Sequence, residues 1–435
     1  MKNRTQQLKD ELIRVDGELG IDKHHKMLSN PFVFMRGSAQ LFYADLAGGE
    51  IPLPKLCQSW PHTTIMGDCH LSNFGFFTEE GSHGEQIIFG PNDFDDACIG
   101  NPAWDLVRFL ASIELCRDYC QGLLEGLYPP LEEPKGEHCL STDHAHKAQL
   151  AFLHTYRKTL KKSVKKPDYR YRAVNSFNRS KLMRKAYKKA CERSTGGQKF
   201  SRKSSLAKAV DLTLVPLKFR NRPGRYKRLD AATVSHIIHT FAPYVDDQIL
   251  DVVQRQDAGT GSVNMARYYL LVGPTDTPGE AQWPLFHVVE VKCQREAAPL
   301  HYFDHLPPMN RLNPAHLTVN CQRLMARRPD IVLDEVVWQD AHWLVRSRHH
   351  ARYNLDPEQI ATAKGSVKHN FLDYVKHCAR ALALAHARGD IRSTEFERRL
   401  STELPEVADD LRLAADKNAQ QIKADRLWLA EVLTP

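Results

Sequence analysis

Three short segments near the start of the chain carry the residue types that phosphoryl transfer requires. They read MGDCHLSNFG (66–75), PNDFDDA (91–97) and NPAWDL (101–106). A divalent cation must bridge the phosphates of a nucleotide, and magnesium prefers hard oxygen ligands, which Asn73 and Asp93 can supply. Asp68, on the same loop as Asn73, can orient an attacking hydroxyl and accept its proton. Asp95 is a further candidate for contact with the metal or the substrate.

The elements around these segments predict how they meet. Three short apolar runs read as strands, the last two separated by a turn-rich stretch: HTTIM (62–66), FGFF (74–77) and QIIF (86–89). The hairpin would bring Asp93 back beside the loop that carries Asp68. The competing interpretation is an acidic loop that binds a structural cation, or turn chemistry alone. We favour phosphoryl transfer because the three pieces occur in the right order and at close spacing.

The loop GDCHLSN resembles the GDxHxxN catalytic loop of aminoglycoside and choline phosphotransferases. The two segments that follow resemble the metal-binding aspartate of these enzymes and the helix that supports their loop. The resemblance implies that Asp68 is the catalytic base and that Asn73 and Asp93 are magnesium ligands. It also implies that Asp105 braces the loop from within, with His70 as a second supporting residue.

A second region offers groups that can hold phosphates. Residues 257–265 read DAGTGSVNM between two apolar runs, which predicts a glycine loop that turns between two strands. Backbone amides at Gly259 and Gly261, with the adjacent Ser262, can approach phosphate because glycine has no Cβ in the way. A flexible hairpin is the commoner explanation of two such glycines.

The next strand, HVVEVK (287–292), resembles the V-x-V-K strand whose lysine holds the α- and β-phosphates in kinases. Lys292 on its own would read as an ordinary strand-end lysine, and the preceding glycine loop favours the functional interpretation. Members of an uncharacterised bacterial family that the chain also resembles usually carry an acid right after this lysine, where this chain has Cys293. Either Glu296 or Gln322 would then have to position Lys292.

The order of these pieces predicts a circular permutation. Only about sixty residues precede Asp68, too few for a five-stranded lobe with its helix. The helix CARALALAHARGD, which ends at Asp390, resembles the helix that runs into the catalytic loop of those enzymes. Asp390 is rejected as the base, because the residue five positions later is Glu395 rather than an amide. We therefore expect an α+β, protein-kinase-like two-lobed fold, permuted so that the catalytic loop precedes the glycine-loop lobe.

This order divides the chain into four parts. They are the catalytic part of the larger lobe (1–130), a basic helical segment (131–242), a β-rich nucleotide-covering lobe (243–350) and the remaining helices of the larger lobe (351–435).

The overall order also resembles an uncharacterised bacterial family that is grouped with the kinase-like fold. The shared segments are PFxFxRG, GDxHxxNFG and NDFDxA, followed by a glycine loop, a V-K strand and ALAxAHAR near the end. The resemblance implies a fold and a nucleotide site, and it gives no substrate. Where the family's glycine loop ends in a third glycine, this chain has Asn264, a residue that tolerates a left-handed conformation.

Composition limits the remaining choices. Across 435 residues the net charge is +8, and the ten cysteines form no C-x-x-C pair, which is typical of a reduced, cytoplasmic protein. No apolar run approaches the length of a membrane span, so we expect no membrane partner. The basic region 157–227 reads as a solvated helical surface that leaves nucleic acid or an anionic substrate open as partners. The same surface argues against a polycationic aminoglycoside substrate.

Several local expectations complete this picture. A loop is expected at 22–31, a half-buried helix face at Cys116 and Cys120, and a final helix at 406–433 with Pro405 in its first turn. The runs IVLDEVVWQ and HWLVRSR predict a hairpin around Asp340.

The sequence as a whole favours an enzyme that uses ATP and Mg²⁺ to phosphorylate a hydroxyl of a small molecule or a protein. A nucleotide-binding pseudoenzyme with a regulatory role is the first alternative, because the partner of Lys292 is not settled. Nucleotidyl transfer, which leaves AMP on the acceptor, is the second. A pure nucleic-acid-binding protein comes last, because a basic surface explains nothing about the acidic loops.

Overall fold

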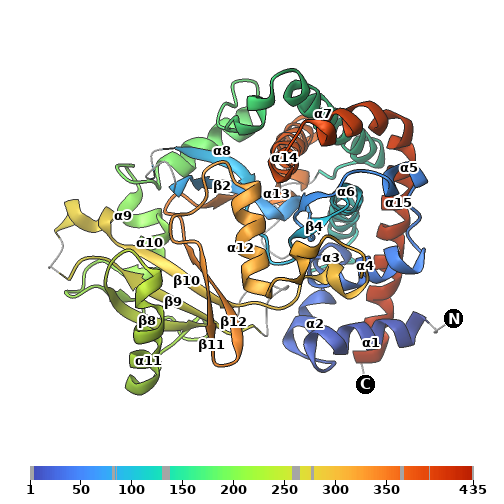
Figure 1. Cartoon of the computed structure of the whole chain (residues 1–435). Coiled ribbons are helices and arrows are strands. Elements are labelled where there is room, and N and C mark those ends of the chain that lie inside the picture. The colour runs from blue at the N-terminus through green and yellow to red at the C-terminus, as the bar shows by residue number, and fades with distance from the viewer. Residues whose placement is uncertain are drawn as a thin grey trace.

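The apolar runs in the second half of the chain form one six-stranded antiparallel sheet in the computed structural model (Figure 1). The structure describes residues 4–80, 84, 86–129, 138–256, 265–275, 279–362, 367–390 and 392–433. The strand order is β11-β12-β10-β9-β8-β7. The strands are β7 (Tyr226–Lys227), β8 (Ile249–Arg255), β9 (Arg267–Val272), β10 (His287–Cys293), β11 (Asp334–Trp338) and β12 (Ala341–Ser347).

Both faces of this sheet are covered, so β10 is buried along nearly its whole length although it carries His287, Glu290 and Lys292. Successive side chains of a strand point to opposite faces. Val289 and Val291 pack in a cluster with α11 on one face, and Val288 packs in a cluster with α10 on the other. Glu290 and Lys292 share the face of Val288 by the same alternation. The two helices are α10 (Ser205–Ala209) and α11 (Ala231–Phe241).

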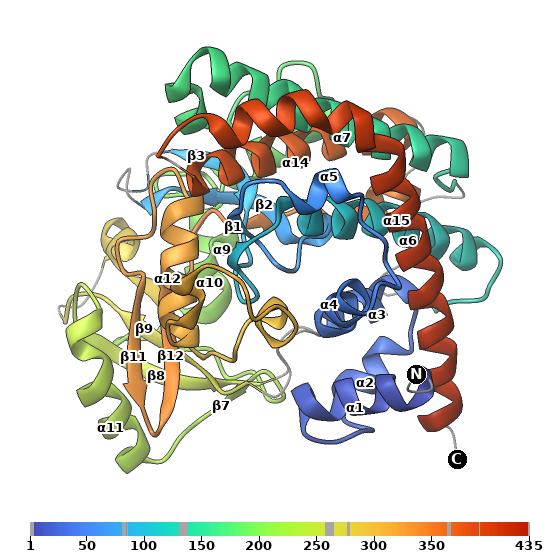
Figure 2. The ribbon, with the colours of Figure 1, turned by 45° about the vertical axis from the view of Figure 1, so that its right-hand side comes forward.

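Helix α12 (Pro314–Met325) joins the sheet to the helical part of the protein. It starts where Asn313 accepts a hydrogen bond from the His316 N–H at 2.8 Å, with a proline at its first position. The helix packs against β11, β12 and α14, as Figure 2 shows for the two strands. Its place between the sheet and the helices ties the two parts of the chain together.

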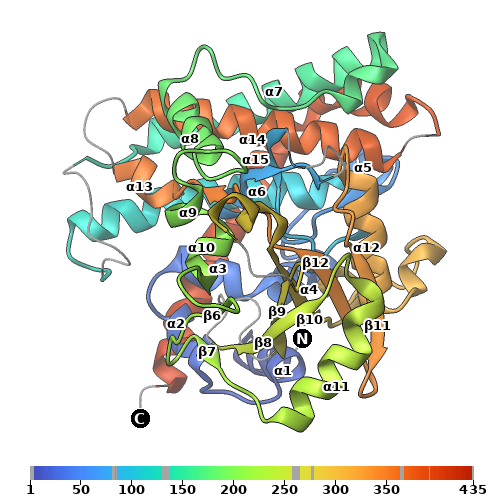
Figure 3. The ribbon, with the colours of Figure 1, turned by 90° about the vertical axis from the view of Figure 1, so that its left-hand side faces the viewer.

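The helical part is built from both ends of the chain around a shared apolar core. Arg4, in the first helix, pairs with both Asp45 and Asp425, so the first and last helices lie side by side. Figure 3 shows α7, α14 and the first part of α15 together on the side away from α11. The helices are α1 (Arg4–Asp16), α2 (Asp22–Met27), α3 (Pro31–Gly37), α4 (Ala39–Gly48), α5 (Lys55–Gln58), α6 (Pro102–Leu124), α7 (Thr142–Lys165), α8 (Lys181–Cys191), α13 (Pro357–Thr362), α14 (Val367–Gly389) and α15 (Glu395–Leu433). The short helix α9 (Phe200–Lys203) packs beside α10 on the sheet instead.

Short strands position the acidic segments between these two parts. The predicted hairpin is confirmed: β2 pairs with β3 antiparallel, with Phe74 opposite Pro91. A second pair, β1 with β4, encloses the same region, and β13 extends the hairpin on its other edge. The strands are β1 (Thr63–Ile65), β2 (Phe74–Thr78), β3 (Ile87–Pro91), β4 (Cys98–Gly100) and β13 (Tyr353–Asn354), and a further pair joins β5 (Val210–Asp211) to β6 (Lys218–Phe219).

Three local expectations were wrong, and packing explains each. The stretch expected as a loop at 22–31 contains α2, whose Met27 is fully buried. Cys116 and Cys120 are fully buried because α15 and α7 cover α6. The last helix starts ten residues before Pro405, which therefore lies inside it. The Ser401 carbonyl, which would accept from an N–H at position 405, accepts instead from Arg157 Nε at 2.8 Å.

The hairpin expected around Asp340 is confirmed, with Gln339 and Asp340 both at positive φ. Among the described helices, none combines the length and the apolar character that crossing a membrane would require.

Candidate active site

The Asp68 loop (residues 66–75) is held from below by the buried Asp105. Its carboxylate accepts hydrogen bonds from the Met66 N–H at 2.7 Å and the Gly67 N–H at 3.0 Å. His386 lies 3.0 Å from the same carboxylate, and its side chain is also fully buried. A Cβ at Gly67 would lie 1.8 Å from the Asp96 carbonyl, and its φ is +74°. The loop therefore packs directly on the acidic turn (residues 91–97) and needs a glycine to do so.

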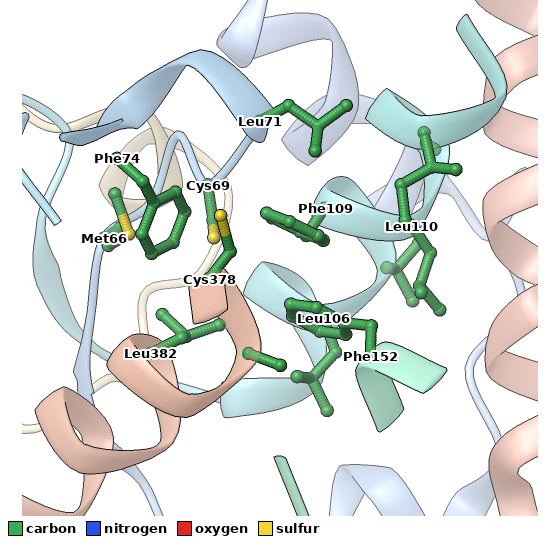
Figure 4. Close-up of a cluster of buried hydrophobic side chains, with 14 of the residues drawn as sticks. Met66, Cys69, Leu71, Phe74, Leu106, Phe109, Leu110, Phe152, Cys378 and Leu382 are labelled. Atoms are coloured by element: carbon green, nitrogen blue, oxygen red, sulfur yellow. The ribbon is translucent and has the colours of Figure 1, made fainter. Parts of the chain in front are cut away.

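Two tyrosines fix the loop backbone from other helices. The Tyr43 hydroxyl donates to the Gly67 carbonyl, and the Tyr374 hydroxyl donates to the Leu71 carbonyl, each at 2.6 Å. Below the loop, Phe74 and its neighbours pack against α6, α7 and α14 (Figure 4). The backbone geometry of the loop is thus set by side chains that come from far along the chain.

Asp68 lies on the partly exposed side of this loop, and its carboxylate is ionised. Its side chain is 19% exposed, and its Oδ1 atom lies 2.6 Å from Arg108 Nη2. His70 Nε2 lies 3.5 Å from the other carboxylate oxygen. Burial alone would raise the pKa of Asp68, but the charges of Arg108 and His70 outweigh it and hold that pKa well below its usual range. Asp68 is therefore ionised at neutral pH.

Asn73 and Asp93 are brought together by the hairpin. The Asn73 Nδ2 atom donates to the Asp68 carbonyl at 2.9 Å, which leaves its amide oxygen for other partners. The Asn92 N–H donates to the Asn73 carbonyl at 3.1 Å, so Asp93 follows directly beside the loop. Among the described residues, the Asp93 Oδ1 atom is buried without a hydrogen-bond partner. A buried carboxylate oxygen of this kind is expected where a cation binds.

Lys292 of β10 reaches the acidic turn from the other part of the fold. Its ammonium group contacts the Asp95 carboxylate, 197 residues away in the chain. Gln294 also donates to Asp95, at 3.4 Å, and Arg295 forms a two-pronged ion pair with Asp96 at 2.8 and 2.9 Å. Burial lowers the pKa of Lys292 to about 7, although the negative charge of Asp93 acts in the opposite direction. The lysine strand and the acidic turn therefore face each other.

Of the remaining predicted residues, Gly259, Gly261 and Ser262 fall outside the described residues. Within the described part of the chain, neither Glu296 nor Gln322 forms a hydrogen bond or ion pair with Lys292, and Glu296 pairs with His301 at 3.0 Å. The acid that contacts the lysine is Asp95, which comes from the early acidic turn rather than from the residues after the strand.

The structure adds residues that the sequence reading missed. Arg108 lies one helical turn after Asp105, so both reach the loop from one face of α6, and this i+3 spacing was a usable signal. Glu290, two residues before Lys292, is fully buried and pairs with Arg267 at 3.0 Å and Arg346 at 2.7 Å. It also pairs with Arg348 at 3.2 Å. No local signal marked Glu290, because its three partners come from β9 and the end of β12.

The site can hold a magnesium ion that is shared with a bound polyphosphate. Asp93 offers an unpartnered oxygen, and Asn73 keeps its amide oxygen available. Across the residues that the structure describes, no three His, Cys, Asp or Glu side chains gather into a metal site. Magnesium commonly binds through one or two side chains and completes its shell with substrate phosphates and water, so this donor set fits it.

Removing the Asp105 carboxylate should destabilise the protein. We expect Asp105→Ala to lower the free energy of unfolding by about 3 kcal/mol, because two loop amides and His386 would lose their buried partner. Denaturant unfolding followed by circular dichroism measures the change. Asp409→Ala, at a carboxylate that is 83% exposed, should change stability by less than about 0.5 kcal/mol. Equal effects of the two substitutions would contradict the bracing role.

Fold and site together define an α+β protein in which the Asp68 loop and the acidic turn face a buried lysine of a six-stranded antiparallel sheet. The chain belongs to the family described as "Uncharacterized protein conserved in bacteria" (DUF2252), whose profile matches residues 15–120 and 136–426. The matched stretches contain every candidate site residue named above. Neither the comparison with curated proteins nor that with solved structures found a match.

Proposed function

We propose that the protein is an ATP- and Mg²⁺-dependent phosphotransferase that transfers the γ-phosphate to a hydroxyl of a small molecule or a protein. The observation that carries this proposal is the contact between Lys292 and Asp95, beside Asp93 and the Asp68 loop. Phosphoryl transfer needs cations at the phosphates, oxygen ligands for magnesium and a carboxylate at the attacking hydroxyl. One small region of this protein supplies all three.

Each residue has a role in this proposal. Lys292 neutralises phosphate charge, and it exchanges Asp95 for the nucleotide when the nucleotide binds. Asp93 and Asn73 hold a magnesium ion, which screens the charge that develops during transfer. Asp68 orients the acceptor hydroxyl and takes its proton. Asp105 and Arg108 are positioning residues, because they act through the loop and through Asp68.

The end of α14 supports the proposed circular permutation of a kinase-like fold. A Cβ at Gly389 would lie 2.5 Å from Thr63 Oγ1, and that hydroxyl donates to the His386 carbonyl at 2.6 Å. The C-terminal end of this helix therefore abuts β1, the strand that leads into the Asp68 loop. The resembling phosphotransferases run such a helix directly into the loop. Here the same neighbours meet in space although they are far apart in sequence.

A nucleotide-binding regulatory module is a second candidate function. Helix α12, which packs on the sheet beside β12, carries no acidic residue that could hold Lys292 as kinases hold theirs. The pairing of Lys292 with Asp95 would then persist with nucleotide bound, and no phosphate would be transferred.

Nucleotide binding tests the proposal first. Isothermal titration should show ATP binding that requires Mg²⁺ and is lost with EDTA. We expect Lys292→Met to weaken ATP binding by at least about 10-fold, and Asp93→Asn to abolish its dependence on Mg²⁺. Lys227→Met, at an exposed lysine of the same sheet, is the matched control and should bind as the unaltered protein does. Binding that is insensitive to both site variants would contradict the proposed site.

The product then separates the alternatives. Incubation with labelled ATP and bacterial extract should release ADP and leave a labelled phosphate on an acceptor. Release of pyrophosphate with AMP on the acceptor would replace phosphoryl transfer by nucleotidyl transfer. ATP binding without any transfer would favour the regulatory module.

A further inference from the structure

An arginine-lined cavity lies beside the candidate active site. It opens between the β2–β3 hairpin, the end of α12 and the segment that follows β12. Phe94 of the acidic turn contributes to its wall. Among the described lining residues, Asp68, Asp95 and Lys292 are absent, so this cavity is separate from the groups assigned to phosphoryl transfer.

The lining carries a large excess of positive charge. Seven arginines face two carboxylates, Glu79 and Asp330, an excess of five positive charges. Glu290 is buried outside the lining and pairs with two of these arginines, Arg346 and Arg348. Counting its charge still leaves an excess of four positive charges. Both lining carboxylates are themselves engaged. Glu79 pairs with Arg327, and Asp330 accepts hydrogen bonds from the N–H groups of Val332 and Ser347.

Four of the arginines have no carboxylate partner within the described part of the chain. Arg388 is 8% exposed and donates to the carbonyls of Met325 and Arg170. The pKa of Arg352 is lowered to about 10, by burial first and then by the charges of Arg348 and Arg346. Arg172 and Arg328 are exposed at the rim. Like charges held this close repel one another, and an anion between them would relieve that repulsion.

A buried polar atom in the same wall also lacks a partner. The Gln322 Oε1 atom is buried without a hydrogen bond among the described residues, and Gln322 lines the cavity. Leaving such an atom unpaired costs about 1–3 kcal/mol. A hydroxyl group or an ordered water that enters the cavity with a ligand would satisfy it.

We propose that this cavity binds a small molecule that carries two or more linked phosphate groups. Planar guanidinium groups bind phosphate through two parallel hydrogen bonds, and the excess of four to five charges matches a diphosphate or triphosphate better than a single anion. The ligand can be a phosphorylated metabolite or the polyphosphate tail of a second nucleotide. The site does not depend on the phosphotransferase proposal, because it uses different side chains.

Binding of inorganic pyrophosphate and tripolyphosphate tests this inference. Isothermal titration of the full chain, without Mg²⁺ and at fixed ionic strength, should show saturable binding with tripolyphosphate tighter than orthophosphate. The double variant Arg172→Gln/Arg328→Gln should weaken it by at least about 10-fold. Both residues are exposed, so the variant is expected to fold. Arg352→Gln, deeper in the cavity, should give a loss of similar size.

A second double variant, which removes two arginines outside the cavity, controls for the loss of positive charge from the protein as a whole. Arg184 and Arg311 are also exposed and lie outside the cavity lining. Arg184→Gln/Arg311→Gln should leave the affinity within about two-fold. An equal loss in both double variants, or no saturable binding to the unaltered protein, would overturn the site. ATP, tripolyphosphate and adenosine distinguish the source. ATP that competes better than tripolyphosphate favours a nucleotide tail, and equal competition favours a phosphorylated metabolite. Displacement by adenosine alone would replace the polyphosphate site by a nucleoside site.

Discussion

Replacing Asp68 with asparagine is expected to slow phosphoryl transfer by a factor of about 10²–10⁴, with ATP binding within about two-fold of the unaltered protein. Asparagine keeps the shape of the side chain and can still accept a hydrogen bond from Arg108, but it cannot take a proton from the acceptor. The low pKa of Asp68 means that the carboxylate is available throughout the neutral range, so the loss should be seen at every pH from 6 to about 8. Transfer to the acceptor, followed by labelled phosphate, measures the effect.

Loss of structure must be separated from loss of chemistry in this experiment. Arg108 is fully buried and would lose its charged partner in Asp68→Asn, which destabilises a protein. The double variant Asp68→Asn/Arg108→Gln removes that unpaired charge and should regain stability without regaining transfer. Asp304→Asn, at an exposed carboxylate, controls for the change in charge. Full turnover by Asp68→Asn would refute the assignment of the base.

Glu290→Gln is expected to be the most destabilising of the substitutions considered, with a loss of about 3–5 kcal/mol. Glu290 is fully buried and is the shared partner of Arg267, Arg346 and Arg348. Its removal would leave three largely buried guanidinium groups without a counter-charge, on the sheet face that also carries Lys292. Denaturant unfolding at neutral pH measures the loss.

The dependence of the free energy of unfolding on pH provides a second test of Glu290→Gln. Burial would raise the pKa of Glu290, but the three arginines hold that pKa well below its ordinary value of 4.5. A carboxylate whose folded-state pKa is lowered stabilises the fold fully above the unfolded value and loses that contribution as the pH falls through the folded value. The stability difference between the unaltered protein and Glu290→Gln should therefore be complete at pH 7 and shrink below pH about 4.5.

A neighbouring glutamate provides the control. Glu335 of β11 pairs with His316 and its side chain is 25% exposed. Glu335→Gln should cost less than about 1 kcal/mol, because a partly solvated ion pair contributes little. A similar loss for both substitutions would show that burial of the Glu290 cluster is not what stabilises the sheet.

Local sequence determined the elements that carry the candidate site. The turn-rich stretch between two short apolar runs was enough to predict the β2–β3 hairpin, since its register follows from turn length and strand alternation. The same holds for the lysine on β10 and for the helix that carries Asp105. Where local signals were ambiguous, packing decided: Pro405 stays inside a helix because Arg157 takes the carbonyl that the proline leaves free.

The sequence also led us to expect an uncharacterised bacterial family, and the chain belongs to one. The partner of Lys292 could not be predicted from local sequence. Glu296 and Gln322 were considered because they follow the lysine in sequence, whereas the contacting acid, Asp95, precedes it by 197 residues.

The sequence by itself determined the β2–β3 hairpin, the hairpin at Asp340, the strand that carries Lys292 and the helix that carries Asp105, because those choices depend on periodicity and turn chemistry within a few residues. Only the tertiary structure decided that Lys292 meets Asp95, that Glu290 gathers three arginines and that seven arginines share one cavity. Those contacts join segments that are distant in the chain. They are fixed by how whole faces of the sheet and helices bury their apolar surface, a property that no single stretch of sequence contains.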